Sequence, residues 1–170
     1  MAGITHAFVS EVEDGADETV VRPSNWNAEH TGLKMVRKAA DQIVNNSEVL
    51  VNDTHLFFAV GANEIWQFDI VLFCLSASVT PDIDYLFDVP AGAAIRRWTF
   101  WSMVGVDQWF DATVSATIAV VDNDRVCMFR CLYTGAAAAG DVQFKWAQHT
   151  ATAEDTKILL NSHIIAHRLA

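Results

Sequence analysis

The strongest constraint on the fold is an alternating apolar run at residues 65–75. Side chains of a β-strand point to opposite faces in turn, so residues two apart share a face. One face of this run is apolar throughout and carries Trp66, Phe68, Ile70, Leu72 and Cys74. The other face becomes apolar over its far half, at Val71, Phe73 and Leu75. A strand that is apolar on both faces lies at the centre of a structure or against a second subunit.

Shorter runs of the same kind follow along the chain and are separated by turn residues. We expect strands in residues 56–60, 65–75, 83–89, 94–104, 110–121, 125–133, 142–146 and 158–169. The polar residues 122–124 predict a tight turn, with residues 125–133 as the return strand of a hairpin. Seven to nine strands, without a long helix or βαβ alternation, predict an all-β fold, an antiparallel β-sandwich of jelly-roll-like type.

Composition narrows the classes of partner. The chain is 52% hydrophobic and 19% charged, yet no run reaches the length of a membrane span, so we expect no membrane segment. The apolar excess must then enter a core or a subunit interface. A net charge of −10 argues against nucleic acid, whose binding proteins concentrate Lys and Arg. Cys74, Cys127 and Cys131 lie in apolar alternating runs, so we interpret them as reduced core residues.

The first 34 residues differ from the rest and predict an extended arm before a sandwich domain at residues 35–170. Pro23 biases the preceding residue towards an extended conformation. Ser24 offers a helix N-cap oxygen, so we expect one helical turn over residues 25–30. Trp26 stands in that turn among polar neighbours and needs another surface to bury it. Residues 32–46 fit either helical or strand spacing from the pattern alone.

Three short sequence blocks of the arm are similar to a motif of known proteins. The blocks T-H-A-F-V-S at residues 5–10, D-G-A-D at 14–17 and V-R-P-S-N-W-N-A-E-H at 21–30 resemble the N-terminal motif of tailed-bacteriophage structural proteins. Those proteins more often have Asp where this chain has Asn25. The segments F-K-W-A-Q-H-T and S-H-I-I-A-H-R-L are similar to the end of such proteins. The resemblance implies a β-rich C-terminal domain, and it favours strand over helix in residues 32–46.

The function that this resemblance implies is structural and non-enzymatic. We expect a virion component, such as a head decoration, head-fibre or tail-fibre-like protein, assembled in the host cytoplasm and bound to other virion proteins. Its arm would anchor it through Arg22, Pro23, Ser24, Asn25, Trp26, Asn27 and His30. Trp26 would be the buried anchor, and Arg22 would pair with an acidic group. By analogy with phage sandwich proteins, we expect a homotrimer.

Other groups of polar residues have simpler explanations than a functional site. On a strand His163 and His167 stand roughly 13 Å apart at about 3.3 Å per residue, too far for one metal ion. Residues 122–124 lack the glycine and distal glutamate of a calcium loop. The aspartates of residues 82–88 are most simply a solvated strand face, although a pair of carboxylates could also serve glycoside hydrolysis. No catalytic or cofactor-binding motif is present, so we expect no enzyme activity and no cofactor.

The tryptophans leave one alternative open. Trp98, Trp101 and Trp109 could line a surface that stacks on the sugar rings of a host glycan, which would make the domain a receptor-binding module of a fibre. The simpler interpretation is that they fill the core or a subunit interface, where aromatic residues are also enriched.

Overall fold

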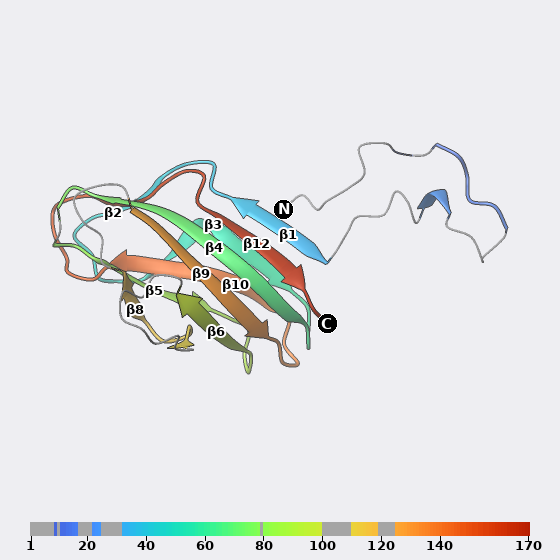
Figure 1. Cartoon of the computed structure of the whole chain (residues 1–170). Helices are drawn as coiled ribbons and strands as arrows, with labels where there is room; N and C mark the ends of the chain where they lie inside the picture. The colour runs from blue at the N-terminus through green and yellow to red at the C-terminus, as the bar shows by residue number, and fades with distance from the viewer. Residues whose placement is uncertain are drawn as a thin grey trace.

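The computed structural model describes residues 9, 11–16, 22–24, 32–78, 80–99, 110–118 and 125–170, with the backbone alone for Trp98, Thr99 and Phe110. The strands are β1 Leu33–Arg37, β2 Gln42–Val44, β3 Val51–Val60, β4 Ile65–Ser76, β5 Ile83–Asp88, β6 Ala94–Thr99, β7 Phe110–Asp111, β8 Ala116–Ile118, β9 Arg125–Thr134, β10 Gly140–Gln148, β11 Thr156–Ile158 and β12 His163–Arg168. They form two antiparallel sheets that pack against each other (Figure 1). The large sheet has the order β1-β12-β4-β9-β6-β7, with β11 joining β2 to β4, and the small sheet has the order β3-β10-β5-β8.

The strand pairs are nested along the chain. The first strand pairs with the last, and each later strand pairs with the next one inward: β1 with β12, β2 with β11, β3 with β10, β4 with β9, β5 with β8 and β6 with β7. The chain is thus one long antiparallel ribbon, and further pairs such as β12 with β4 and β10 with β5 form where it folds over itself. Such a folded ribbon in two sheets is a jelly roll. The predicted all-β, jelly-roll-like sandwich is confirmed.

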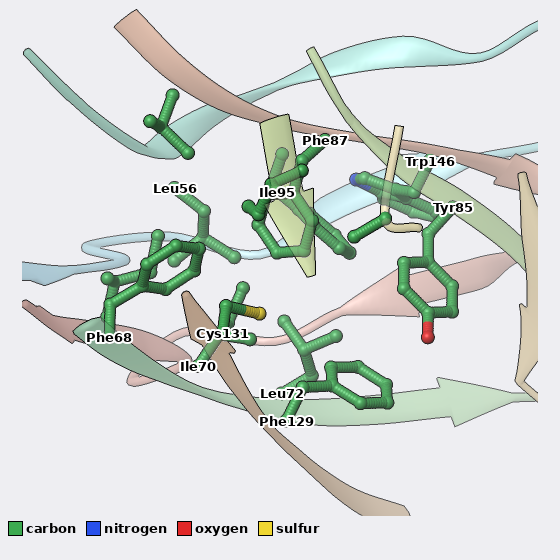
Figure 2. Close-up of a cluster of buried hydrophobic side chains, with 14 of the residues drawn as sticks. Leu56, Phe68, Ile70, Leu72, Tyr85, Phe87, Ile95, Phe129, Cys131 and Trp146 are labelled. Carbon is green, nitrogen blue, oxygen red and sulfur yellow. The ribbon is translucent and has the colours of Figure 1, made fainter. Parts of the chain in front are cut away.

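The core lies between the inner faces of the two sheets (Figure 2). Residues alternate between buried and half-buried along the whole of β4, and its buried face is the apolar face of the sequence pattern. Rings from opposite sheets meet directly, because Phe68 of β4 contacts Phe87 of β5 at 5.4 Å and Tyr85 of β5 stacks on Phe129 of β9 at 4.9 Å between centroids. Aromatic pairs of this geometry add to the free energy gained by burying their area.

The predicted hairpin of residues 110–133 is wrong. The run at residues 110–121 contains two strands in different sheets, since β7 pairs with β6 and β8 pairs with β5, while β9 pairs with β4 and β6. The chain crosses between the sheets at Ala112, whose N–H donates to Ile95 O and whose carbonyl accepts from Phe87 N–H. The Asp111 carboxylate accepts hydrogen bonds from the backbone and hydroxyl of Thr113, which bends the chain at this point.

The last predicted strand is also divided. Residues 158–169 hold the end of β11 and all of β12, with a turn between them in which Ser162 N–H donates to Leu159 O and Asn161 has a φ of 70°. Residues 32–46 contain two strands, so the choice of strand over helix is confirmed. Pairing with β12 begins at Leu33, just inside the segment expected to be arm.

Candidate functional site

Two sequence blocks of the arm are joined by a contact between Asp14 and Ser24. Pro23 and Ser24 have helical backbone conformation. The backbone N–H of Ser24 donates to Asp14 Oδ1 at 2.9 Å, and the Ser24 hydroxyl donates to Asp14 Oδ2. The first N–H groups of a helical turn have no partner within the turn, and a carboxylate there is favourable. Asp14 therefore caps this turn from ten residues upstream.

This contact corrects the role expected of Ser24. Its hydroxyl was predicted to accept a hydrogen bond as an N-cap, but it donates to Asp14, and the turn begins at Pro23 rather than at Asn25. The hydrogen bonds from the Ser24 side chain and backbone lower the pKa of Asp14, and the charge of Arg22 acts in the same direction. The blocks D-G-A-D and V-R-P-S are thus joined in the folded chain.

The remaining anchor candidates lie outside the described residues, namely Asn25, Trp26, Asn27 and His30. Arg22 and Pro23 are half-buried, and Ser24 is exposed. The apolar side chains of Val9 and Val12 are exposed as well. The described arm therefore presents apolar groups that the sandwich does not cover.

The candidate glycan-binding tryptophans are mostly outside the described residues too. This applies to Trp101 and Trp109, and for Trp98 the structure gives the backbone position in β6. That position is opposite Arg130 of β9, whose guanidinium binds the Asp69 carboxylate through two hydrogen bonds of 2.8 and 2.9 Å. The structure does not show the three tryptophans as one surface.

The outward face of the large sheet carries side chains in rows that run across the strands. One row holds Met35, Ile165, Asp69 and Arg130, and the next holds Arg37, His163, Val71 and Met128. The exposed fraction is 55% for Met35 and 44% for Met128. We call this surface the large-sheet outer face, and define it by these two rows, the row Leu33, His167, Gln67, Leu132, Arg96 and Asp111, and the pair Phe73 and Val126.

A pocket of about 370 Å³ opens at one end of the large-sheet outer face. Its lining is mainly apolar and comes from β4, β9, the turn before β12 and the residue before β2: Phe73, Val126, Leu159, Leu160, Asn161, Arg125 and Asp41. Asp41 is engaged within the chain, because its Oδ1 accepts the Leu160 N–H at 2.7 Å. The second apolar face of residues 65–75 was one sign of this surface in the sequence, but the pocket depends on strands that are distant in sequence.

The outward face of the small sheet is different in character. Lys145 of β10 and Asp88 of β5 form an ion pair of 2.9 Å, and His149 Nδ1 lies 2.9 Å from Asp84 Oδ1. The Thr117 hydroxyl donates to the same Asp84 oxygen. The hydrogen bond and the charge of Asp84 raise the pKa of His149. We call this surface the small-sheet outer face. It carries these mutually bonded polar groups together with the exposed side chain of Phe57.

A buried ion pair joins the two sheets, and the sequence did not indicate it. Lys38 follows β1, Asp53 belongs to β3, and Lys38 Nζ lies 2.7 Å from Asp53 Oδ2 with both side chains fully buried. The other carboxylate oxygen accepts the N–H groups of His55 and Leu56. Lysine is seldom buried unless it is paired, so no local pattern marks such a residue.

His163 and His167 both lie on β12 and face outward, as the strand interpretation predicted. Within the described ranges, no group of three His, Cys, Asp or Glu side chains is placed to hold a metal ion. The polar residues 122–124 lie outside those ranges. Cys74 and Cys131 are buried free thiols, Cys127 is a half-buried one, and burial raises the pKa of Cys131.

Within the described part of the chain, no helix is long and apolar enough to cross a bilayer.

Comparison with known proteins does not assign this chain to a family. The sequence matches no protein-family model and no curated protein. Among solved structures, the chain is similar to a chain of the infectious bursal disease virus Gt strain, with 10% identity, a TM-score of 0.24 and coverage of 80% of this chain and 37% of that one. For the Gx strain the values are 11%, 0.22, 91% and 39%. The chain spans about two fifths of those chains, and similarities this distant carry no argument about function.

Proposed function

We propose that this protein is a structural component of a tailed-bacteriophage virion, held in the particle by its N-terminal arm and displaying its jelly roll on the capsid or tail. It acts by binding rather than by catalysis. Jelly rolls serve many functions, so the fold alone does not carry the proposal. The arm carries it, because the resemblance to phage structural proteins is concentrated there.

The supporting observation is the contact between Asp14 and Ser24. It joins two of the three sequence blocks of the resemblance, so these blocks act as one unit rather than as separate matches. A segment that orders on binding loses conformational entropy, and a contact already made in the free chain reduces that loss. The Asp14–Ser24 contact would thus prepare the turn that presents Trp26 to a partner.

Incorporation into particles tests this proposal. Replacing Trp26 by Ala should reduce the amount of the protein in purified particles at least tenfold, since an aromatic anchor commonly contributes 2 kcal/mol or more, on the order of a thirtyfold change in binding. Asp14→Asn should have a smaller effect in the same direction, because it weakens the turn without removing the anchor. Val49→Ala, at an exposed position of the sandwich, is the control.

Two results would contradict the proposal. Normal amounts of the Trp26→Ala protein in particles would show that the arm is not the anchor. Absence of the wild-type protein from particles, detected with an antibody against the sandwich, would remove the virion assignment itself.

A second candidate function is binding of a host surface glycan. The position of Trp98 opposite Arg130, which is itself paired with Asp69, favours it, since aromatic and planar polar groups together recognise sugars. Titration of tryptophan fluorescence with host polysaccharide should then give a saturable change that Trp98→Ala removes. An unchanged signal in the wild-type protein would leave the structural role alone.

A further inference from the structure

The large-sheet outer face has the composition of a surface that another polypeptide covers. Met35 and Ile165 are exposed large apolar residues opposite each other on β1 and β12. Met128 is exposed on β9, on the other side of β4, and Val126 continues the apolar surface along β9 to the pocket. Several exposed apolar side chains on one face typically mark an interaction site. The pocket at its end is mainly apolar and has room for an aromatic side chain.

Charge indicates the class of partner. Arg37, Arg96 and Arg130 against Asp69 and Asp111 give this face a net charge of +1, with His163 and His167 also present, whereas the whole chain carries −10. Arg37 donates to the neutral amide oxygen of Asn161, and Asp69 is matched by Arg130. At the pocket Arg125 adds a cation and Asp41 adds an anion, so the pocket leaves this net charge unchanged. Two copies of this face would bring cations together, so an acidic partner fits better.

The chain itself contains such an acidic segment. Residues 1–31 hold six acidic residues and one arginine, a net charge of −5, which is half the charge of the whole chain. The same segment contains the apolar groups Phe8, Val9, Val12 and Trp26. Its charge and apolar content are both complementary to the large-sheet outer face.

Chain length favours the arm of another copy over the arm of the same copy. Leu33 and Gln67 lie in the same row, two strands apart, and Phe73 at the pocket is six residues beyond Gln67 along β4. At about 3.3 Å per residue and 4.8 Å per strand, Leu33 and Phe73 are roughly 22 Å apart. Seven residues from Trp26 to Leu33 span at most roughly 23–25 Å. The chain's own arm would have to double back fully extended, whereas a neighbouring arm has no such limit.

We propose that the acidic N-terminal arm of one copy lies on the large-sheet outer face of a neighbouring copy and inserts Trp26 into the pocket formed by β4, β9 and the turn before β12. This deepens the proposed function, because it rests on the binding role of the arm and names a second copy of the chain as its partner. The contact is head-to-tail, and such contacts close into rings when the rotation permits. A trimer linked by its arms would be one such ring.

Photo-crosslinking of the full-length protein tests the contact directly. A light and a ¹⁵N-labelled preparation, both with p-benzoylphenylalanine in place of Trp26, are mixed, equilibrated and irradiated. We expect adducts that join light to heavy chains and that map to the peptides containing Phe73, Val126 or Leu160. Adducts only within one chain, or adducts mapping elsewhere, would overturn the proposal.

Matched substitutions test the face without changing the arm. Met128→Glu puts a negative charge on the large-sheet outer face, and Phe57→Glu puts the same charge at a comparably exposed position of the small sheet. Sedimentation should show self-association weakened at least tenfold by Met128→Glu and unchanged by Phe57→Glu, with both variants folded by circular dichroism. Equal effects of the two variants, or a wild-type protein that stays monomeric at micromolar concentration, would contradict the proposal.

These measurements use purified protein without particles, so they are independent of the virion assignment. Crosslinks between copies in a protein that is absent from particles would refute the proposed function and leave the arm contact standing. A protein that enters particles through Trp26 but gives no crosslink to the pocket would refute the contact and leave the proposed function standing.

Discussion

The two outer faces of the sandwich come from sheets with similar inner faces, yet they differ in kind. The large-sheet outer face exposes Met35, Ile165 and Met128 in adjacent rows. On the small-sheet outer face, polar groups bind one another, as in the Lys145–Asp88 ion pair. An antiparallel sheet with one solvated face normally has polar residues there. This difference is what we expect if the small sheet faces water and the large sheet is covered by another copy, as proposed.

The largest expected effect concerns the Lys38–Asp53 ion pair, which is buried between the two sheets. Lys38→Met leaves the Asp53 carboxylate buried without its cation, so we expect the free energy of unfolding to fall by about 3–5 kcal/mol. Urea denaturation measures this loss. The matched control is Lys145→Met on the small-sheet outer face, where the pair is partly exposed and the loss should stay below about 1 kcal/mol.

A similar small loss for both lysine variants would show that the buried pair does not tie the sheets together. The two sheets would then differ only in the side chains of their outer faces.

An intermediate effect is expected for oxidation of the exposed methionines. If another copy covers the large-sheet outer face, oxidation of Met35 and Met128 by hydrogen peroxide should slow several-fold as protein concentration rises, because association removes both sulfur atoms from solvent. Mass spectrometry of the peptides measures the rates. As a control, hydroxyl-radical labelling of Phe57 on the small sheet should not depend on protein concentration. Equal protection of both faces would show that association does not cover the large-sheet outer face selectively.

The smallest effect is expected at His149 on the small-sheet outer face. Its pKa is raised mainly by the hydrogen bond and charge of Asp84. The charged pair stabilises the fold at pH values below the unfolded pKa of histidine, and this contribution is lost as the pH rises through the folded pKa. In Asp84→Asn, NMR titration of the His149 ring should give a pKa closer to the ordinary value.

Asp82→Asn is the matched control for this titration. The charge of Asp82 raises the pKa of His149 less than the hydrogen bond and charge of Asp84 do. The pKa of His149 should therefore change less in Asp82→Asn than in Asp84→Asn. A larger change in Asp82→Asn would show that the ring pairs with a different carboxylate.

Much of the fold could be predicted because an alternating pattern assigns faces locally. The burial of every second residue in β4 follows from side-chain geometry, and its central position follows from two apolar faces. The predicted hairpin failed because a tight turn signals a reversal without naming the partner strand. In this jelly roll β9 pairs with β4, more than fifty residues earlier in the chain.

The candidate site was predictable to a smaller extent. A helical turn near Ser24 was expected from the sequence, but over residues 25–30 rather than from Pro23. The capping carboxylate was not expected, since Asp14 is ten residues from Ser24. The pocket could not be predicted, because its walls come from β4, β9 and the turn before β12. Rows such as Met35, Ile165 and Asp69 form only when strands from both ends of the chain lie side by side.

The sequence by itself determined the fold class, the faces of the strands and the acidic charge of the first 31 residues, because each is set by residues close together along the chain. Tertiary structure alone decided which strands pair, where Lys38 finds its carboxylate, and that one outer face is apolar and cationic while the other is paired and polar. These depend on contacts between distant residues, and such contacts are selected by the burial of the whole core rather than by any local pattern.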